Sequence, residues 1–378
     1  MNRAGIYIHI PFCRSRCSYC DFATGAYEAQ LVTRYVQALA AEIAAFRLPY
    51  ALREVETIYF GGGTPSLLKP TEVAHVLEAV RARFRVTHDA EITMEMNPGT
   101  LTLATLSEYR RLGVNRASYG AQTFDDRELR QLGRTHTALD VRQTILTLRE
   151  AGFRNVSFDL IAGLPRQTLD GWARNLDEAL RLKPEHLSFY LLEVHEGTPL
   201  ADQIRSGRQP APDDDLAAEM YRLMLERAAA AGYEHYEISN LCLPGFESRH
   251  NSKYWLAEPV YGFGCSAHSY DGQRTRWANE RDAARYVELI EEGRTAVVET
   301  TRLDERKAAS EAIFLGLRLM RGISLNQHRA RFNQDLRELH AGELARLSEA
   351  GLIELNEDLM KLTRSGALLS NEVFATFV

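Results

Sequence analysis

The sequence predicts an α/β fold: an incomplete, TIM-like (β/α)6 barrel followed by a C-terminal, mainly helical, winged-helix-like domain. Apolar, β-rich runs alternate with helical patterns from the start of the chain to about residue 240. Such alternation is typical of βα units with a parallel sheet. Six units can be distinguished instead of eight, so we expect the barrel to be open. The length of 378 residues suits two to three domains.

Short apolar runs mark the six predicted strands, which are Ile6–Ile10, Glu56–Phe60, Glu91–Met96, Arg116–Ala121, Val156–Ile161 and Leu187–Leu192. Helical patterns separate them at Gln30–Phe46, Glu72–Phe84, Leu103–Leu112, Leu139–Ala151 and Trp172–Arg181. A further helix is predicted at Asp214–Ala231, before a short apolar run at Tyr233–Ser239. In parallel α/β folds the functional groups lie at the carboxyl ends of the strands, so we expect them there.

The pattern changes after residue 240. Leu241–Asp271 is rich in Gly, Pro, Tyr and His and has little periodicity, which indicates an extended functional loop. Arg281–Gly293 looks helical, and a hairpin is predicted around Asn356–Asp358 within a mostly helical tail. We therefore expect three parts, namely a barrel over 1–240, a bridging region over 241–300 and a helical, winged-helix-like domain over 301–378.

Composition excludes some classes of function. The 45 basic and 51 acidic residues give a net charge of −6, which argues against a generally basic nucleic-acid-binding protein. No apolar stretch approaches the roughly 20 residues of a membrane span, and residues 1–10 lack the apolar core of a signal peptide. A cytoplasmic protein is therefore expected. Five cysteines are too few for a disulfide framework in a chain of this length.

Three of the cysteines follow the first strand directly. Cys13, Cys17 and Cys20 form a C-x3-C-x2-C loop. Three thiolates on a short irregular loop can hold three irons of a cubic [4Fe–4S] cluster and leave the fourth iron open to a ligand. Spacing alone leaves a zinc site and incidental surface thiols as alternatives, although a structural zinc ion normally has four ligands. Cys242 and Cys265 are expected to be small buried hydrophobes.

Polar residues and glycines follow the other strands. Three consecutive glycines at Gly61–Gly63 allow a ligand to approach the backbone, although a tight strand-to-helix turn also needs glycine. Carboxylates at strand ends can bind an ammonium group or ribose hydroxyls, but they are also common as solvated residues at a loop edge. Arg134 can pair with a carboxylate in bidentate fashion. Residues that end or follow the third to sixth strands are Glu95, Gln122, Asp159 and Glu193.

With these features in place, the sequence resembles the radical S-adenosylmethionine (SAM) enzymes, and among them the oxygen-independent coproporphyrinogen III oxidase family. The resemblance covers essentially the whole chain. Its motifs here are YIHIPFC, GGGTPS, MEMNPG, GAQTFDD, LGRTH, FDLIAGLP, RHNSKYW and GFGCSAHS.

The resemblance implies roles for individual residues. Cys13, Cys17 and Cys20 would hold the [4Fe–4S] cluster, whose open iron would bind the amino and carboxylate groups of S-adenosylmethionine. In the family, one-electron reduction of the cluster can cleave the sulfonium bond to give a 5′-deoxyadenosyl radical. The implied contacts to S-adenosylmethionine are Tyr7, Tyr19, Gly63, Thr64, Glu95, Gln122, Arg134 and Asp159.

Two departures distinguish the branches of this family. The decarboxylating oxidases resemble C-x3-C-x2-C-x-C, and Phe22 stands here at the place of the additional cysteine. Those oxidases also carry a longer N-terminal segment that helps to build the substrate site. Both differences argue against oxidative decarboxylation of coproporphyrinogen III, which stays as the alternative function. A radical SAM enzyme acting on another substrate is a third hypothesis.

The motifs that are present resemble those of the haem chaperone branch. Its H-N-x-x-Y-W mark stands intact from His250 to Trp255. A neutral imidazole can ligate haem iron, and aromatic rings can pack on a porphyrin. Without the resemblance, a histidine hydrogen-bonded within the protein would be favoured. We expect His250 to ligate haem, with His9, Cys265 and His268 as secondary candidates. Haem would be the cargo, acceptor proteins would include membrane-bound respiratory enzymes, and a homodimer is also expected.

Overall fold

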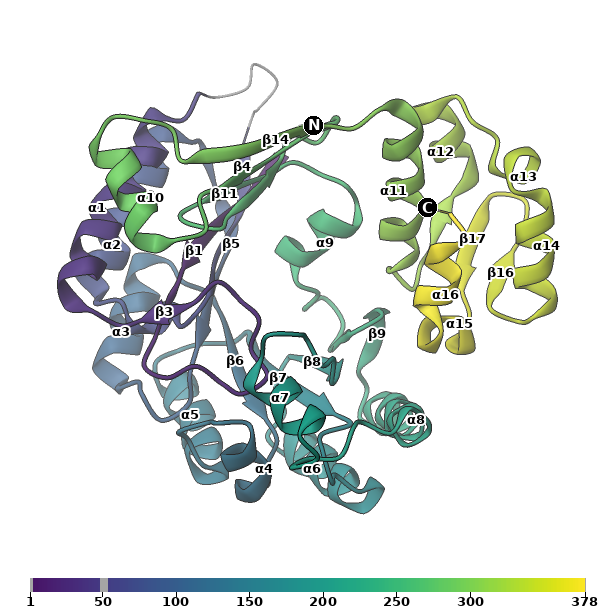
Figure 1. Cartoon of the computed structure of the whole chain (residues 1–378), viewed down its shortest axis with the longest axis horizontal. Helices are drawn as coiled ribbons and strands as arrows, with labels where there is room; N and C mark the ends of the chain where they lie inside the picture. Colours follow the sequence, from purple (N-terminus) through teal and green to yellow (C-terminus); the bar gives the residue numbers. More distant parts are fainter. Residues whose placement is uncertain (1–2, 48–53, 378) are drawn as a thin grey trace.

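The computed structural model describes residues 3–47 and 54–377. Within these residues, seven parallel strands form the centre of a twelve-stranded sheet that curves into an open barrel (Figure 1). Six of the seven are the predicted strands, now bounded as β1 Arg3–Ile10, β4 Glu54–Gly62, β5 Val86–Met96, β6 Arg116–Gln122, β7 Val156–Ala162 and β8 His186–Leu191. The predicted incomplete barrel is therefore confirmed.

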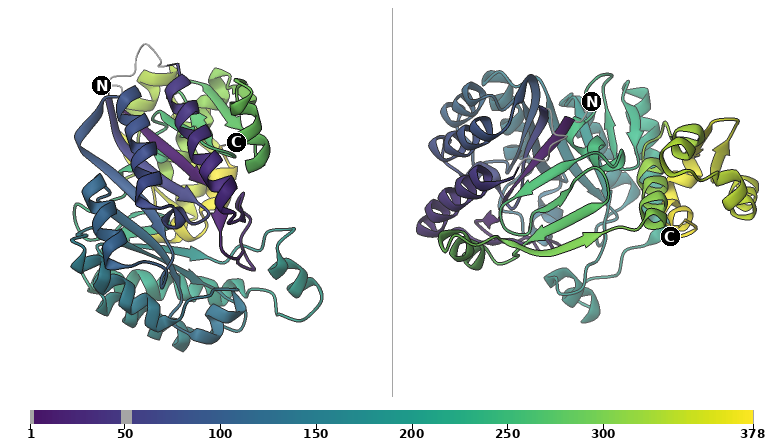
Figure 2. Two further views of the ribbon diagram at one scale, coloured as in Figure 1. Left: turned by 90° about the vertical axis from the view of Figure 1, so that its left-hand side faces the viewer. Right: turned by 90° about the horizontal axis from the view of Figure 1, so that it is seen from above.

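Helices cover the outer side of the curved sheet (Figures 1 and 2). The predicted ones are α1 Ala29–Ala45, α2 Pro70–Arg83, α3 Leu103–Leu112, α5 Ala138–Glu150, α6 Leu169–Arg181 and α8 Asp214–Ala230. Short elements that the sequence pattern does not predict are β2 Phe12–Cys13, β3 Gly25–Ala26, the 3-10 helix Pro65–Leu67, α4 Asp126–Gln131 and α7 Pro199–Arg205. Each spans at most seven residues, which is too short for a clear periodicity.

The two faces of the barrel strands differ in polarity. Ile6, Ile58 and Met94 face outward and belong to the main hydrophobic core beneath the helices. Successive side chains of a strand point to opposite faces, so the alternate residues, including Thr57 and Arg116, line the inside of the barrel. The interior is therefore polar, in contrast to the usual apolar core of a closed barrel.

The prediction of an extended loop over Leu241–Asp271 is wrong. This segment contains part of β10 Asn240–Cys242, helix α9 Arg249–Trp255, and strands β11 Val260–Phe263 and β12 His268–Tyr270. The seventh parallel strand, β11, pairs with β1, from which it is separated by about 250 residues of sequence. The other elements of this part are β9 Glu234–Glu237, β13 Thr275–Asn279, α10 Ala283–Glu291 and β14 Val297–Arg302. Two of these strands pair with partners that are distant in sequence, β11 with β1 and β10 with β8. Strands β10, β11 and β12 also have only three or four residues, too few for a clear periodicity.

The twelve-stranded sheet contains strands from both sides of the predicted boundary at residue 240, and its last strand along the chain, β14, ends at Arg302. The three-part division of the chain stays a prediction, with the bridging region folded as an edge of the barrel sheet.

The C-terminal residues form a separate small core beside the open side of the barrel (Figures 1 and 2). A three-stranded sheet in the order β15-β17-β16 contains the hairpin predicted around Asn356–Asp358, as expected for a winged-helix-like unit. Its elements are α11 Glu305–Leu317, β15 Ile323–Ser324, α12 Leu325–Phe332, α13 Leu336–Leu339, α14 Ala341–Glu349, β16 Ile353–Leu355, β17 Leu359–Leu362, α15 Arg364–Leu368 and α16 Ser370–Ala375. Among the described residues, no helix is long and apolar enough to cross a membrane.

Candidate functional site

The cysteine loop lies between β1 and α1, at the carboxyl ends of the barrel strands. Its backbone is anchored at Ser18, whose N–H donates to the Leu132 carbonyl at 2.9 Å and whose carbonyl accepts from the Leu200 N–H at 2.8 Å. Cys13, Cys17 and Cys20 are free and partly exposed. The loop is thus held from two sides while its three thiols stay accessible.

The donor set fits an iron–sulfur cluster. Burial raises the pKa of the Cys13 and Cys20 thiols, and the neighbouring thiols raise it further. The guanidinium of Arg134 opposes this rise at Cys13, and its Nη1 lies 3.5 Å from Cys17 Sγ. In residues 3–47 and 54–377, no three Cys, His, Asp or Glu side chains are grouped as they would be around one metal ion. Three thiolates around a multinuclear cluster bind different irons and do not need to converge on a single point, so the three cysteines fit the donor set of a cluster.

The glycine turn after β4 packs directly against the cysteine loop. The N–H of Gly63 donates to the Ile10 carbonyl at 2.8 Å, and the N–H of Thr64 donates to the Phe12 carbonyl at 2.9 Å. A Cβ atom on Gly63 would lie 2.8 Å from the Phe12 carbonyl oxygen. Gly63 is therefore required for this close approach of backbones, independently of any ligand.

Asn97 links the end of β5 to the cysteine loop, and sequence reasoning did not single it out. Its Nδ2 donates to Thr64 Oγ1 at 3.0 Å, and its Oδ1 accepts from Arg134 Nη2 at 3.2 Å. Thr64 Oγ1 lies 3.5 Å from Cys13 Sγ. The available signal was its position just after Glu95, at the end of a predicted strand.

Glu95 is held at the inner wall by two donors. The Tyr59 hydroxyl donates to Oε1 at 2.8 Å and the Gly62 N–H donates to Oε2 at 3.0 Å. Burial raises the pKa of Glu95 to about 7, and the negative charge of Asp159 adds to the rise. A group that binds here would meet a carboxylate that changes its charge near neutral pH.

Gln122 and Arg134 present unused polar atoms at the same end of the barrel. Gln122 adopts a left-handed backbone conformation, with φ 64°. Its Oε1 and the Nε of Arg134 are buried and have no hydrogen-bond partner among the described residues. Asp159 lies close by, where burial raises its pKa and the charges of Arg116 and Arg134 oppose the rise. Donors and acceptors left open in this way are what a polar ligand needs.

Of the two tyrosines expected here, Tyr19 lies with the cysteines, where burial raises its pKa and the charge of Arg134 opposes the rise. Tyr7 lies deeper. Its hydroxyl is 3.1 Å from His9 Nδ1, and its ring stacks on Tyr59 and on His250, with centroids 6.1 and 6.4 Å apart. Tyr7 thus connects the end of the barrel that carries the cysteine loop to the opposite end.

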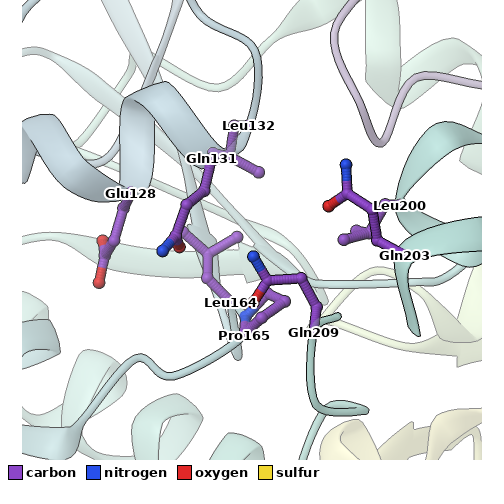
Figure 3. A pocket seen from close by; sticks show the side chains of 8 residues that line it. All are labelled: Glu128, Gln131, Leu132, Leu164, Pro165, Leu200, Gln203 and Gln209. Carbon is purple, nitrogen blue, oxygen red and sulfur yellow. The ribbon is translucent and has the colours of Figure 1, made fainter. Parts of the chain in front are cut away.

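A small pocket beside the cysteine loop is lined by α4, the turn after β7 and α7 (Figure 3). Its volume is ≈ 10 Å³, which suits one water molecule. It is not a cofactor site.

Helix α9 contains HNSKYW and closes the other end of the barrel. The Glu91 carboxylate accepts hydrogen bonds from the backbone N–H groups of Arg249 and His250, at 3.1 and 3.0 Å. His250 is 1% exposed; its Nδ1 lies 2.9 Å from Thr57 Oγ1 and its Nε2 lies 3.2 Å from the Tyr254 hydroxyl. Burial, followed by the charge of the nearby lysine of α9, lowers the pKa of His250 to about 3. The imidazole is neutral, but both ring nitrogens are engaged.

Two further residues of α9, Lys253 and Trp255, fasten the helix. Lys253 is buried, and its Nζ lies 2.5 Å from Glu56 Oε1 and 2.8 Å from Glu258 Oε2. Burial by itself would raise the pKa of Glu56, but the hydrogen bond and charge of Lys253 hold it below its ordinary value. Trp255 stacks under the Arg318 guanidinium, 4.2 Å from the ring centroid, and so joins the barrel to the C-terminal domain.

Comparisons with known proteins agree with this arrangement. The family model "Radical SAM superfamily" matches residues 7–179 and "HemN C-terminal domain" matches residues 303–369. Heme chaperone HemW of Bacillus subtilis is 37% identical over 98% of both chains. The chain belongs to the radical SAM superfamily, in the HemW family. Radical S-adenosyl methionine domain-containing protein 1 of Bos taurus mitochondria is 37% identical over 97% of this chain and 85% of its own.

The solved structure of coproporphyrinogen III oxidase (HemN) from Escherichia coli, described as a radical SAM enzyme, has a TM-score of 0.86 and 24% identity. It covers all of this chain and 90% of its own, and at this identity it supports the fold alone.

In this HemW-family chain, the structure gathers most of the expected cofactor residues at one end of the barrel. These are Cys13, Cys17, Cys20, Tyr19, Gly63, Thr64, Glu95, Gln122, Arg134 and Asp159. His250 lies toward the other end of the barrel. It contacts Thr57 on β4, and Thr57 is five residues, or roughly 16 Å along the strand, from Gly62, which contacts Glu95.

The secondary candidates have other environments. His9 is buried and its Nε2 lies 3.0 Å from the Ala23 carbonyl oxygen, while Cys265 is buried beside the Tyr35 hydroxyl. His268 is exposed. Glu193 is exposed; its Oε2 lies 3.7 Å from His195 Nε2, and the Nδ1 of that histidine lies 3.8 Å from the carboxylate of Asp21, next to Cys20. Phe22, at the place of the missing cysteine, is 63% exposed.

Proposed function

We propose that this protein is a haem chaperone, which carries a [4Fe–4S] cluster and S-adenosylmethionine and transfers haem to acceptor proteins. One observation supports this proposal most strongly. The HNSKYW segment forms a defined helix, α9, in a chain whose relatives over nearly its full length are named haem chaperones. Acceptors that include membrane-bound respiratory enzymes, and assembly as a homodimer, belong to the same proposal.

The cofactor end supports the first part of this proposal. Cys13, Cys17 and Cys20 would hold the cluster, and the open iron with bound S-adenosylmethionine would supply one-electron chemistry. Arg134 places a fixed positive charge beside Cys17, which offsets the charge of thiolate ligands. Glu95 would accept a hydrogen bond from the amino group of S-adenosylmethionine, and Asp159 and Gln122 would pair with its other polar groups.

The remaining residues shape this end of the barrel. Gly63 and Thr64 bring the β4 turn against the cysteine loop, and Tyr19 places its partly buried ring beside two of the thiols. Tyr7 would lie near the cofactor and support its pocket from below, because its ring stacks on Tyr59, whose hydroxyl donates to Glu95.

Haem ligation by His250 requires a change at α9. In the geometry described, Nε2 is engaged with the Tyr254 hydroxyl and Nδ1 with Thr57. A neutral imidazole is the correct form for a haem ligand, so only access to the nitrogen has to change. Under this proposal His250→Ala weakens haem binding, whereas Tyr254→Phe frees Nε2 and strengthens it. The opposite order of the two variants would place the iron ligand elsewhere.

A side-by-side assay tests the function itself. The protein is reconstituted with iron and sulfide under anaerobic conditions, then titrated with haem and incubated separately with coproporphyrinogen III, S-adenosylmethionine and a reductant. We expect saturable haem binding and no protoporphyrinogen. Robust turnover of coproporphyrinogen III would refute the assignment and support the decarboxylating alternative.

A further inference from the structure

A hollow lies at the junction between the barrel and the C-terminal domain, outside the cofactor site. It is lined by Trp255 of α9, Phe314, Leu315 and Arg318 of α11 and its C-terminal cap, and Phe374 and Ala375 of α16. Its volume is ≈ 280 Å³, close to the lower end of small-molecule sites, about 300 Å³. The hollow therefore suits part of a ligand, with the rest left outside.

The walls of the hollow are mostly aromatic. The rings of Phe314 and Phe374 lie side by side, with centroids 6.3 Å apart and planes inclined by 44°. Together with Leu315 and Trp255 they line an apolar surface that a flat ring system can cover.

One cation stands at this surface with donors that are not fully used. The Nη2 of Arg318 forms an ion pair with the Oε2 of the buried Glu237 at 3.8 Å, a separation too long for a direct hydrogen bond, and the Arg318 side chain is 26% exposed. The Nε of Arg318 and the Nε1 of Trp255 are buried and unpaired among the described residues. An anionic group that reaches Arg318 would therefore gain a charge-assisted hydrogen bond.

We propose that this hollow is the seat of the haem macrocycle. The porphyrin packs against Phe314 and Phe374, and a propionate pairs with the Arg318 guanidinium. This inference rests on the proposed function, and adds to it the site and its chemistry. A porphyrin combines a flat apolar ring with carboxylates at one edge, which matches the two properties of the hollow. Part of the ring stays outside the hollow, where an acceptor can reach it.

The lining contains no His, Cys, Met or Tyr among the described residues. The hollow thus binds the ring through packing and charge, and the iron ligand comes from elsewhere. Metal-free protoporphyrin IX should bind to the same place as haem, because neither interaction involves the iron.

The experiment measures the affinities of haem and of metal-free protoporphyrin IX for the full-length, cluster-reconstituted protein by quenching of tryptophan fluorescence. Phe374→Ala and Arg318→Gln should each weaken both affinities by about tenfold. The matched controls are Phe22→Ala, an exposed phenylalanine on the cysteine loop, and Arg329→Gln, an exposed arginine of the C-terminal domain. Both controls should bind as the wild type does.

Three results would overturn the inference. Unchanged affinity in both Phe374→Ala and Arg318→Gln places the ring elsewhere, and so does a loss in Phe22→Ala alone. Binding of haem without binding of protoporphyrin shows that iron ligation, and not this hollow, holds the ring. In these cases the chaperone function stands, whereas failure of the wild type to bind haem at all refutes the proposed function. Iron and sulfide content and the thermal unfolding midpoint show whether each variant has kept its fold.

Discussion

Replacing Glu95 by Gln probes the cofactor end most directly, because the substitution keeps the shape of the side chain and removes its charge. With a pKa of about 7, roughly a tenth of the Glu95 carboxyls are ionised at about pH 6 and half at about pH 7. If binding of S-adenosylmethionine uses the ionised form, the contribution of Glu95 to affinity rises about fivefold over this interval. Gln cannot titrate, so this pH dependence is absent from the variant.

The assay is anaerobic calorimetric titration of the reconstituted protein with S-adenosylmethionine. The ratio of the wild-type affinity to the Glu95→Gln affinity is compared at the two pH values, which cancels the titration of the ligand itself. Above pH 7 the ratio should reach about 10 to 150, the equivalent of about 1.5–3 kcal/mol for a charge-assisted hydrogen bond.

Glu91→Gln is the matched control, because Glu91 lies on the same strand and binds the backbone of α9 instead of facing the cysteines. It should leave the affinity for S-adenosylmethionine and its pH dependence unchanged. A ratio for Glu95→Gln that stays constant between the two pH values would show that the charge of Glu95 plays no part in binding.

The remaining predictions concern the cluster and the seating of α9. Cys17→Ala should abolish the bound iron and sulfide, whereas the buried Cys242→Ala should retain them; equal loss in both would contradict the assignment. Gly5→Ala places a Cβ atom 2.8 Å from a threonine hydroxyl under α9. It should lower the free energy of unfolding, measured in denaturant, by about 1–3 kcal/mol. The control Gly25→Ala meets no atom within 4 Å and should leave this free energy unchanged. Glu56→Gln removes a partner of the buried lysine of α9 and should destabilise by about 1–3 kcal/mol at neutral pH. Because the pKa of Glu56 is lowered by folding, this difference is present above its unfolded pKa and should disappear as the pH falls through its folded pKa; a difference that persists in acid would exclude the charge as its source.

The barrel strands and the cysteine loop were predictable because their signals are local. A buried parallel strand has a continuous run of apolar and β-branched residues. A strand such as Val156–Ala162 can therefore be recognised from its own seven residues. The C-x3-C-x2-C spacing likewise predicts a cluster-binding loop from eight consecutive residues. In contrast, β11 has four residues, and its hydrogen bonds depend on β1 at the far end of the sequence. Its strand identity is therefore a tertiary property.

The chemistry of single residues was also readable, but their partners were not. The sequence by itself determined that this chain has the cysteines of a cluster, a polar set at the strand ends and the HNSKYW segment. Only the tertiary structure decided that Asn97 bridges Thr64 and Arg134, and that His250 has both nitrogens engaged inside the barrel. The hollow between α9, α11 and α16 is another such outcome. Hydrogen bonds and cavities depend on distances between elements, and these distances exist only once the chain has folded.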